Sequence, residues 1–130
     1  MMAEAQDLWR RANRTLATAE KLTTDDPDSA TSRAYYSAFH AVSALLAAEG
    51  RSFTKHSALE AAVHRDLVNA GRCSEEVGIA FSKLAKLRST ADYGSPSHVT
   101  PDEAKDAVAE AQFIVDTVRA MLPGGVAGGA

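Results

Sequence analysis

Residues 80–94, AFSKLAKLRSTADYG, have the pattern of an amphipathic helix that ends at a glycine. Apolar residues recur at helical spacing through this stretch and just before it, at Val77, Ala80, Phe81, Leu84 and Leu87. At about 100° per residue, Arg88 falls about 20° from Val77, so we expect its side chain to point into the protein. Gly94 can adopt the left-handed backbone that ends many helices, and we expect it to end this one.

An arginine that points inward needs hydrogen-bond acceptors, because its charge cannot be removed. Asp92 lies four residues after Arg88 and is within reach if the helix continues that far. Tyr93 adds a phenol beside the pair. Two interpretations stay open: a structural Arg88–Asp92 ion pair that fixes the helix end, or an Arg/Tyr site at a cleft that handles phosphate or RNA.

The composition is that of an ordinary globular domain, with 45% hydrophobic and 24% charged residues in a chain of 130. No stretch alternates apolar and polar residues as a half-buried strand does, so an all-α fold is predicted. We expect one domain over residues 1–122 and a disordered Gly-rich tail over residues 123–130. The longest apolar run, residues 44–48, is too short to span a membrane, and the polar N-terminus does not resemble a secretory signal. We therefore expect no membrane contact and a cytoplasmic location.

Helical periodicity and end signals divide the chain into five predicted helices. They cover residues 3–22, 27–49, 55–70, 74–91 and 101–122, with a loop over residues 92–99. The most specific start signals are Asp26 followed by Pro27, and a capping box from Thr100 to Glu103 with proline at the first helical position. These local signals predict where two of the helices begin.

The net charge of −3 is unevenly distributed, because residues 51–90 carry seven Lys/Arg against four Asp/Glu. A basic surface in this part can meet phosphate, although ordinary solvated helix faces give the same counts. In the first predicted helix, Arg10, Arg11 and Arg14 lie off the apolar stripe. They form either a solvated basic face or a nucleic-acid contact.

Polar residues also gather on the second and third predicted helices. Arg33, Tyr36 and His40 lie together about 150° from the apolar stripe of the second helix. They either pack against a neighbouring helix or form a recognition surface for a partner subunit or for the Arg88 region. Lys55 and His56 fall in the first turn of the third helix, where backbone N–H groups favour anions.

Several classes of site are absent from the sequence. No glycine-rich nucleotide loop occurs, and Glu60 and His64 are four residues apart rather than the three that a di-iron bundle needs. We therefore expect neither a metal nor a cofactor, and we interpret His64 as a solvent-facing residue. The single Cys73 cannot form an intramolecular disulfide.

Three motifs occur in a specific order: RAYYSAF at residues 33–39, KHS at 55–57 and LRSTADY at 87–93. Over residues 5–122 this order resembles the HEPN superfamily, in particular its small stand-alone prokaryotic members. The resemblance implies a five-helix up-and-down bundle that forms a homodimer through its helices. It also implies RNA or nucleotide binding, or a metal-independent RNase activity, often beside a nucleotidyltransferase that acts as antitoxin.

Nuclease members of this superfamily carry an arginine followed, four to six residues later, by a histidine, and two such motifs meet across the dimer. Here the arginine is Arg88, Tyr93 stands in the histidine position, and the next histidine is His98. The candidate catalytic residues are therefore Arg88, Tyr93 and His98. The candidate RNA- or nucleotide-binding residues are Arg88, Asp92, Tyr93, Lys55, His56, Arg33 and Tyr36. Some toxins of the superfamily have a tyrosine near this motif that the partner nucleotidyltransferase modifies with adenylate, and Tyr93 is the candidate for that role.

A ribonuclease without metal needs a cation on the phosphate, a base for the 2′-OH and an acid for the leaving oxygen. Arg88 suits the first role, whereas a tyrosine with a pKa of about 10 is a poorer base than a histidine with a pKa of about 6.5. Three hypotheses follow. The first is an RNA- or nucleotide-binding module of a toxin–antitoxin system. The second is a metal-independent endoribonuclease that uses Arg88 with His98 or His56. The third is a structural homodimeric partner protein, in which the Arg88–Asp92 pair only stabilises the bundle.

Overall fold

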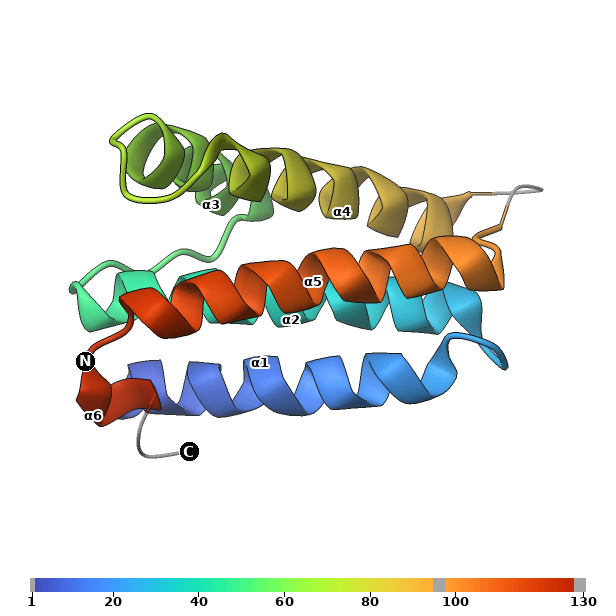
Figure 1. Cartoon of the computed structure of the whole chain (residues 1–130), viewed down its shortest axis with the longest axis horizontal. Helices are drawn as coiled ribbons and strands as arrows, with labels where there is room; N and C mark the ends of the chain where they lie inside the picture. The colour runs from blue at the N-terminus through green and yellow to red at the C-terminus, as the bar shows by residue number, and fades with distance from the viewer. Residues whose placement is uncertain (1, 95–97, 128–130) are drawn as a thin grey trace.

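The computed structural model describes residues 2–94 and 98–127, and every regular element in these ranges is helical (Figure 1). In chain order the elements are α1 (Met2–Leu22), α2 (Pro27–Ala48), α3 (His56–Ala62), the π-helical η1 (Val63–Val68), α4 (Glu75–Tyr93), α5 (Pro101–Met121) and α6 (Gly124–Ala127). The predicted all-α bundle is confirmed. It differs from the prediction in the geometry of the third helix and in the short sixth one.

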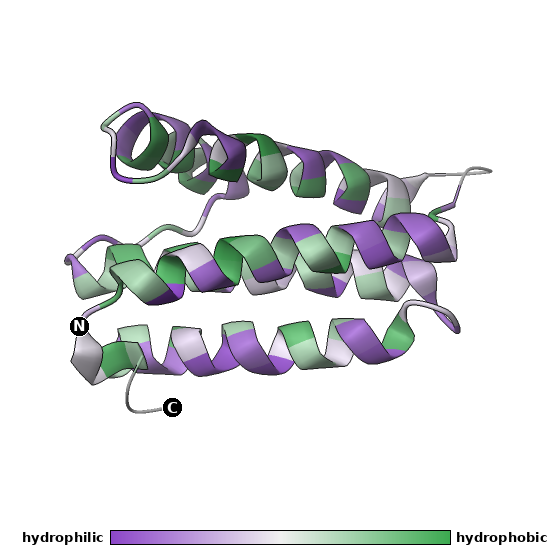
Figure 2. Ribbon diagram, viewed as in Figure 1, coloured by the Kyte–Doolittle hydropathy of each residue, from purple (hydrophilic) through white to green (hydrophobic). Residues whose placement is uncertain are grey.

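Helix α2 is the centre of the bundle, because α1, α4 and α5 all pack against it (Figure 1). Its residues from Ala34 to Ala47 are nearly all buried, and many of them are alanine, which lets neighbouring helices approach closely. Ser37 is buried too, and its Oγ donates a hydrogen bond of 2.8 Å to the carbonyl of Ala12 in α1. In Figure 2 the long helices around α2 each carry hydrophobic and hydrophilic residues, as amphipathic surface helices do.

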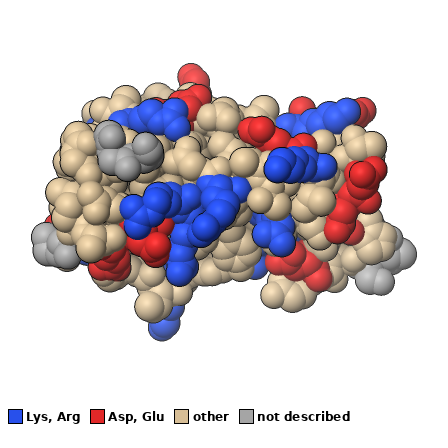
Figure 3. Space-filling view, turned by 90° about the horizontal axis from the view of Figure 1, so that it is seen from below, with Lys and Arg blue, Asp and Glu red and all other residues tan. Residues whose placement is uncertain are grey.

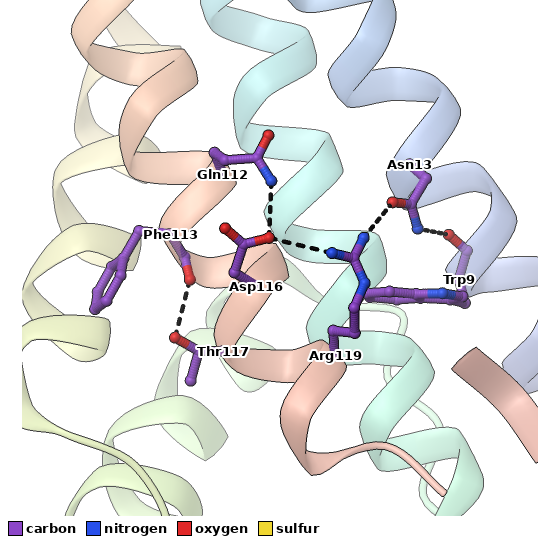
Figure 4. Close-up of polar contacts among 7 residues, drawn as sticks. All are labelled: Trp9, Asn13, Gln112, Phe113, Asp116, Thr117 and Arg119. Carbon is purple, nitrogen blue, oxygen red and sulfur yellow. Dashed lines mark hydrogen bonds and ion pairs between the residues drawn. The ribbon is translucent and has the colours of Figure 1, made fainter. Parts of the chain in front are cut away.

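Polar contacts hold α5 to α1 on one flank of the bundle (Figure 4). The guanidinium of Arg119 lies over the indole of Trp9, 5.3 Å from the ring centroid. Its Nη2 donates to Asn13 Oδ1 at 3.0 Å, and its Nη1 donates to Asp116 Oδ1 at 3.3 Å. Trp9 is 1% exposed, so Arg119 covers the edge of a core residue.

The predicted helix starts are confirmed. Asp26 precedes α2 and accepts a hydrogen bond of 3.3 Å from the backbone N–H of Ser29. Thr100 and Glu103 form the capping box at the start of α5, each side chain accepting from the backbone N–H of the other. Both caps satisfy backbone donors that have no partner within the helix.

The tail prediction is wrong for residues 124–127. These residues form α6, which packs against α1, and Val126 is 1% exposed. Gln6 of α1 donates a hydrogen bond of 2.8 Å to the carbonyl of Gly125. The buried side chain of Val126 and the hydrogen bond from the Gln6 side chain to the Gly125 carbonyl therefore hold this short segment against α1. The last three residues of the predicted tail, 128–130, lie outside the described residues.

Gly94 ends α4 without the left-handed backbone expected of it. Its φ of −69° and ψ of 125° are extended, so other residues could adopt the same conformation. Among the described residues, the left-handed glycines are Gly50, with φ of 82°, and Gly71, with φ of 78°. Each follows a helical segment, as the C-terminal glycine rule describes.

The interpretation of His64 as solvent-facing is wrong. Its Nε2 lies 2.8 Å from Ser82 Oγ in α4, and Ser82 Oγ donates to Glu60 Oε2 at 2.6 Å. A Cβ added at Gly78 would lie 2.9 Å from the His64 ring, so the missing side chain leaves the space that the ring occupies. The π-helical geometry of η1 was not predicted either, because hydrophobic periodicity does not distinguish it from an α-helix.

Charged residues cover the outside of the bundle. Figure 3 looks onto the α1 side and shows Lys and Arg side chains gathered near the middle of that face, with acidic residues around them. Arg10, Arg11 and Arg14 of α1 are exposed, as the sequence predicts, and Arg11 forms an ion pair with Asp7 at 3.2 Å. Within the described residues, no helix combines the length and the apolar character that crossing a membrane requires.

Candidate functional site

The side chain of Arg88 points inward from α4 towards α2, as its place on the apolar stripe predicts. It is 19% exposed. Its guanidinium lies over two aromatic rings of α2, 4.9 Å from the centroid of Tyr35 and 5.8 Å from that of Tyr36. The negative face of an aromatic ring stabilises such a cation. The two tyrosines therefore hold the charge in place without neutralising it.

Only part of the guanidinium is satisfied by hydrogen bonds. Nη1 donates to Asp92 Oδ2 at 3.3 Å and, at 3.5 Å, to the hydroxyl of Tyr36. Nε is buried, and neither Nε nor Nη2 has a hydrogen-bond partner among residues 2–94 and 98–127. The pair with Asp92 is thus one-pronged, whereas a structural Arg–carboxylate pair commonly uses both prongs of the fork.

His56 packs against the same two tyrosines, Tyr35 and Tyr36, and against Phe39. Its ring centroid is 4.7 Å from that of Phe39 and 5.6 Å from those of Tyr35 and Tyr36. Burial, together with the positive charge of Arg88, lowers the pKa of His56 below its ordinary value. The imidazole therefore stays neutral at neutral pH, the form that can accept a proton.

Arg88 and the side chains around it, Tyr35, Tyr36, His56 and Asp92, are called the Arg88 cluster below. A polar hollow of about 290 Å³ lies next to this cluster, between the first half of α2 and the end of α4. It is lined by Asp28, Ser29, Ser32, Arg33, Tyr36, Ala91 and Asp92. Three of the predicted binding residues, Arg33, Tyr36 and Asp92, therefore meet at one place. The hollow carries charges of both signs, and the exposed Arg33 forms no ion pair within the described part of the chain.

The candidate catalytic role of His98 requires it to lie near Arg88, but His98 contacts Asp28 instead. Its Nδ1 is 3.0 Å from Asp28 Oδ2, and the backbone N–H of Val99 donates to Asp28 Oδ1 at 2.9 Å. Asp28 thus ties the segment before α5 to the start of α2. Because Asp28 also lines the polar hollow, His98 stands next to a wall of the hollow rather than in contact with Arg88.

Tyr93 and Lys55 stand apart from the cluster. Tyr93 is on the last turn of α4 and is 76% exposed, and Lys55 is exposed just before α3. Neither side chain makes a hydrogen bond or an ion pair with the described residues. The structure therefore brings together Arg88, Asp92, Tyr36 and His56, with Arg33 at the hollow.

Sequence reasoning missed two members of the site. The position of Tyr35 in the sequence fits the apolar side of its helix, and the residue is indeed 1% exposed, but its ring also faces Arg88. The burial of Tyr35 raises the pKa of its phenol to about 12, so it stays neutral. Asp28 looks in the sequence like an ordinary acidic residue of a first helical turn. Its contact with His98 spans 70 residues and has no local signal.

A metal centre has no support in the described residues, where no three His, Cys, Asp or Glu side chains are close enough together to hold an ion.

Comparisons with known proteins identify relatives along most of the chain. Residues 5–121 match the family model described as the HEPN domain. A UPF0332 protein of Thermotoga maritima is 34% identical over 118 residues, which cover 89% of each chain. A protein of Methanocaldococcus jannaschii named "putative toxin" is 33% identical over 93 residues, which cover 72% of this chain and 69% of that protein.

Proposed function

This chain belongs to the HEPN family, and from that premise we propose that it binds RNA or a nucleotide through Arg88, as the binding module of a toxin–antitoxin system. The observation that supports this proposal most strongly is the arrangement of the Arg88 guanidinium. It is fixed over two tyrosines beside a polar hollow, with Nε and Nη2 unpaired in the described structure. Because Nε is buried, the N–H groups of Nη2 are the donors that can meet the oxygens of a phosphate.

The groups around Arg88 suit the rest of a nucleotide. The hydroxyl of Tyr36 lines the hollow and can donate to a phosphate or a ribose oxygen. Arg33 adds a second cation at the mouth of the same hollow. Asp28 and Asp92 repel a highly charged ligand, so a single phosphate group with its sugar fits better than a dense run of phosphates.

Binding is favoured over cleavage because the cluster lacks a second catalytic group at the position that the nuclease motif requires. Tyr93 stands there and is exposed, and His98 pairs with Asp28. One observation supports the second candidate function, a metal-independent endoribonuclease. His56 packs against both tyrosines that carry the guanidinium, so a neutral imidazole and a cation share one cluster.

A relative named "putative toxin" supports the toxin–antitoxin context, and a nucleotidyltransferase is the proposed antitoxin. Tyr93 is the proposed target of adenylate transfer, because its phenol is exposed and free of partners within the described residues. The proposal also includes a homodimer in which two Arg88 faces meet and the RNA or nucleotide lies between them.

The test measures RNA binding and cleavage by the purified protein in EDTA. We expect Arg88→Ala to weaken binding roughly 10-fold or more, because hydrogen bonds to charged groups contribute about 1.5–3 kcal/mol. The matched control is Arg65→Ala, which removes an exposed arginine that pairs with Asp66. Equal binding by wild type and Arg88→Ala would contradict the proposal. Cleavage in EDTA that His56→Gln abolishes would establish the second candidate instead.

A further inference from the structure

Two of the large apolar side chains that the described structure leaves exposed lie together on α4 and α5. Ile79 of α4 is 59% exposed and Phe113 of α5 is 37% exposed. They line a hollow of about 300 Å³ with Glu76, Ala80 and Glu110. Apolar groups that gather on an otherwise charged surface commonly mark a contact with another protein.

This hollow continues into a groove between the same two helices, which lie side by side (Figures 1 and 2). The groove has a volume of about 300 Å³ and shares Glu110 with the first hollow. Its floor is apolar, and its charges are sorted by helix. The α4 wall carries Lys83 and Lys86, and the α5 wall carries Glu103, Asp106 and Glu110.

The positive charge on α4 and the negative charge on α5 favour a second copy of this chain as the binding partner of the groove. If a second copy faces this groove across a twofold axis that runs parallel to the helices, its α4 lies over α5 of the first copy. Lysines then face carboxylates in both directions, and Ile79 of one copy faces Phe113 of the other. A twofold axis perpendicular to the helices would place α4 over α4 and bring like charges together. The groove is therefore self-complementary in one orientation.

We propose that the groove between α4 and α5 is an interface on which a second copy of this chain seats with its α4 over α5. Lys83 and Glu110 mark the level at which the helices face each other, because Lys83 Nζ lies 3.5 Å from Glu110 Oε1 within one chain. Arg88 lies about 140° around α4 from Lys83, so the groove and the Arg88 face are separate surfaces. Both can be occupied at once, and the groove contact does not depend on RNA or nucleotide binding.

Charge reversal tests the interface, with molar mass in solution as the readout. We expect Lys83→Glu and Glu110→Lys each to halve the mass, because each puts like charges opposite one another in both halves of the interface. The two variants mixed should recover the wild-type mass. In the mixed dimer, the introduced carboxylate of one chain faces the introduced ammonium group of the other, and the second half of the interface keeps the wild-type pair. An ion pair within one chain cannot give this recovery.

Matched controls are Lys105→Glu and Glu20→Lys, exposed changes of the same charge elsewhere, which should keep the wild-type mass. The folded state is checked by thermal unfolding, since an exposed ion pair contributes only about 0–1 kcal/mol and its loss should barely move the melting temperature. A wild-type protein that is monomeric, single variants that keep the wild-type mass, or a mixture that stays at the lower mass would each overturn the proposal.

As a second route, Phe113→Ser leaves the charges in place and should also halve the mass. An unchanged mass for Phe113→Ser would count against the predicted pairing with Ile79.

Discussion

Arg88 and Arg119 are two arginines of one bundle that each lie over an aromatic ring, and they differ in what surrounds the guanidinium. Arg119 lies 5.3 Å from the ring of Trp9, is 51% exposed, and donates to both Asn13 and Asp116. Arg88 lies 4.9 Å from the ring of Tyr35, is 19% exposed, and uses only Nη1. The satisfied arginine fastens α5 to α1. The half-satisfied one is left with donors for a ligand.

The largest expected effect comes from removing the ring under Arg119. Trp9→Ala should lower the free energy of unfolding by about 3–5 kcal/mol, because Trp9 is a fully buried core side chain. Urea denaturation measures this loss. RNA binding by the folded fraction should stay at the wild-type level, since Trp9 belongs to the structural region. A loss of binding beyond the loss of folded protein would remove the distinction between the two arginines.

A change in α4 that touches neither arginine sharpens the comparison. Gly78→Ala should cost about 1–3 kcal/mol of stability, because the new Cβ would lie 2.9 Å from the His64 ring and force it away from Ser82. Gly124→Ala is the control, since its Cβ would meet no atom within 4 Å. If both substitutions leave the urea midpoint unchanged, the close packing of η1 on α4 is contradicted.

Some features of these helices could be predicted from the sequence, and others could not. The caps at Asp26 and Thr100 and the inward direction of Arg88 follow from spacings of a few residues, so they could be predicted. The Asp28–His98 contact joins residues 70 apart, and Arg119 reaches Asn13 across 106 residues. No local pattern carries such contacts, because they depend on how the helices pack.

Two local predictions failed for packing reasons as well. His64 looked solvent-facing because no sequence rule reports that Gly78 opens a space for its ring. The segment 124–127 looked disordered because its glycines outweigh one valine, yet α1 offers a surface that buries Val126. In both cases the missing information was the neighbouring helix.

A smaller effect is expected from the tyrosine hydroxyl at the ligand site. Tyr36→Phe should weaken RNA binding about 2- to 10-fold, the range of a hydrogen bond that contributes about 0.5–1.5 kcal/mol. Stability should change little, because the ring remains. Tyr93→Phe is the matched control: its hydroxyl lies away from the Arg88 cluster, and its binding isotherm should overlay that of wild type. Equal weakening by both changes would place the ligand elsewhere.

The smallest predicted change is a shift in the titration of His56. Arg88→Gln should raise the pKa of His56 towards its ordinary value, because the charge of Arg88 helps to lower it, and Arg119→Gln should leave it unchanged. Histidine resonances followed by NMR across pH measure both. An unchanged His56 titration in Arg88→Gln would contradict the shared cluster.

The lowered pKa values also fix the sign of the pH dependence of stability. Burial lowers the pKa of His56 and of His40 in the folded protein, so the unfolded chain binds more protons below about pH 6.5. Their contribution to stability is present above that pH and is lost as the pH falls. The melting temperature should therefore drop between neutral and mildly acidic pH, and less so in a His40→Gln, His56→Gln double variant. A melting temperature that rises as the medium becomes mildly acidic would show the opposite sign.

The salt dependence of single-stranded RNA binding tests the central distinction most directly. Each phosphate contact that a cation makes adds about 0.7 to the slope of log affinity against log salt concentration. We predict that Arg88→Ala lowers the slope by about 0.7, the value for one lost contact, and that Arg119→Ala keeps the wild-type slope. Equal slopes for wild type and Arg88→Ala, or a loss of slope in Arg119→Ala, would contradict the assignment of Arg88 as the ligand-binding arginine.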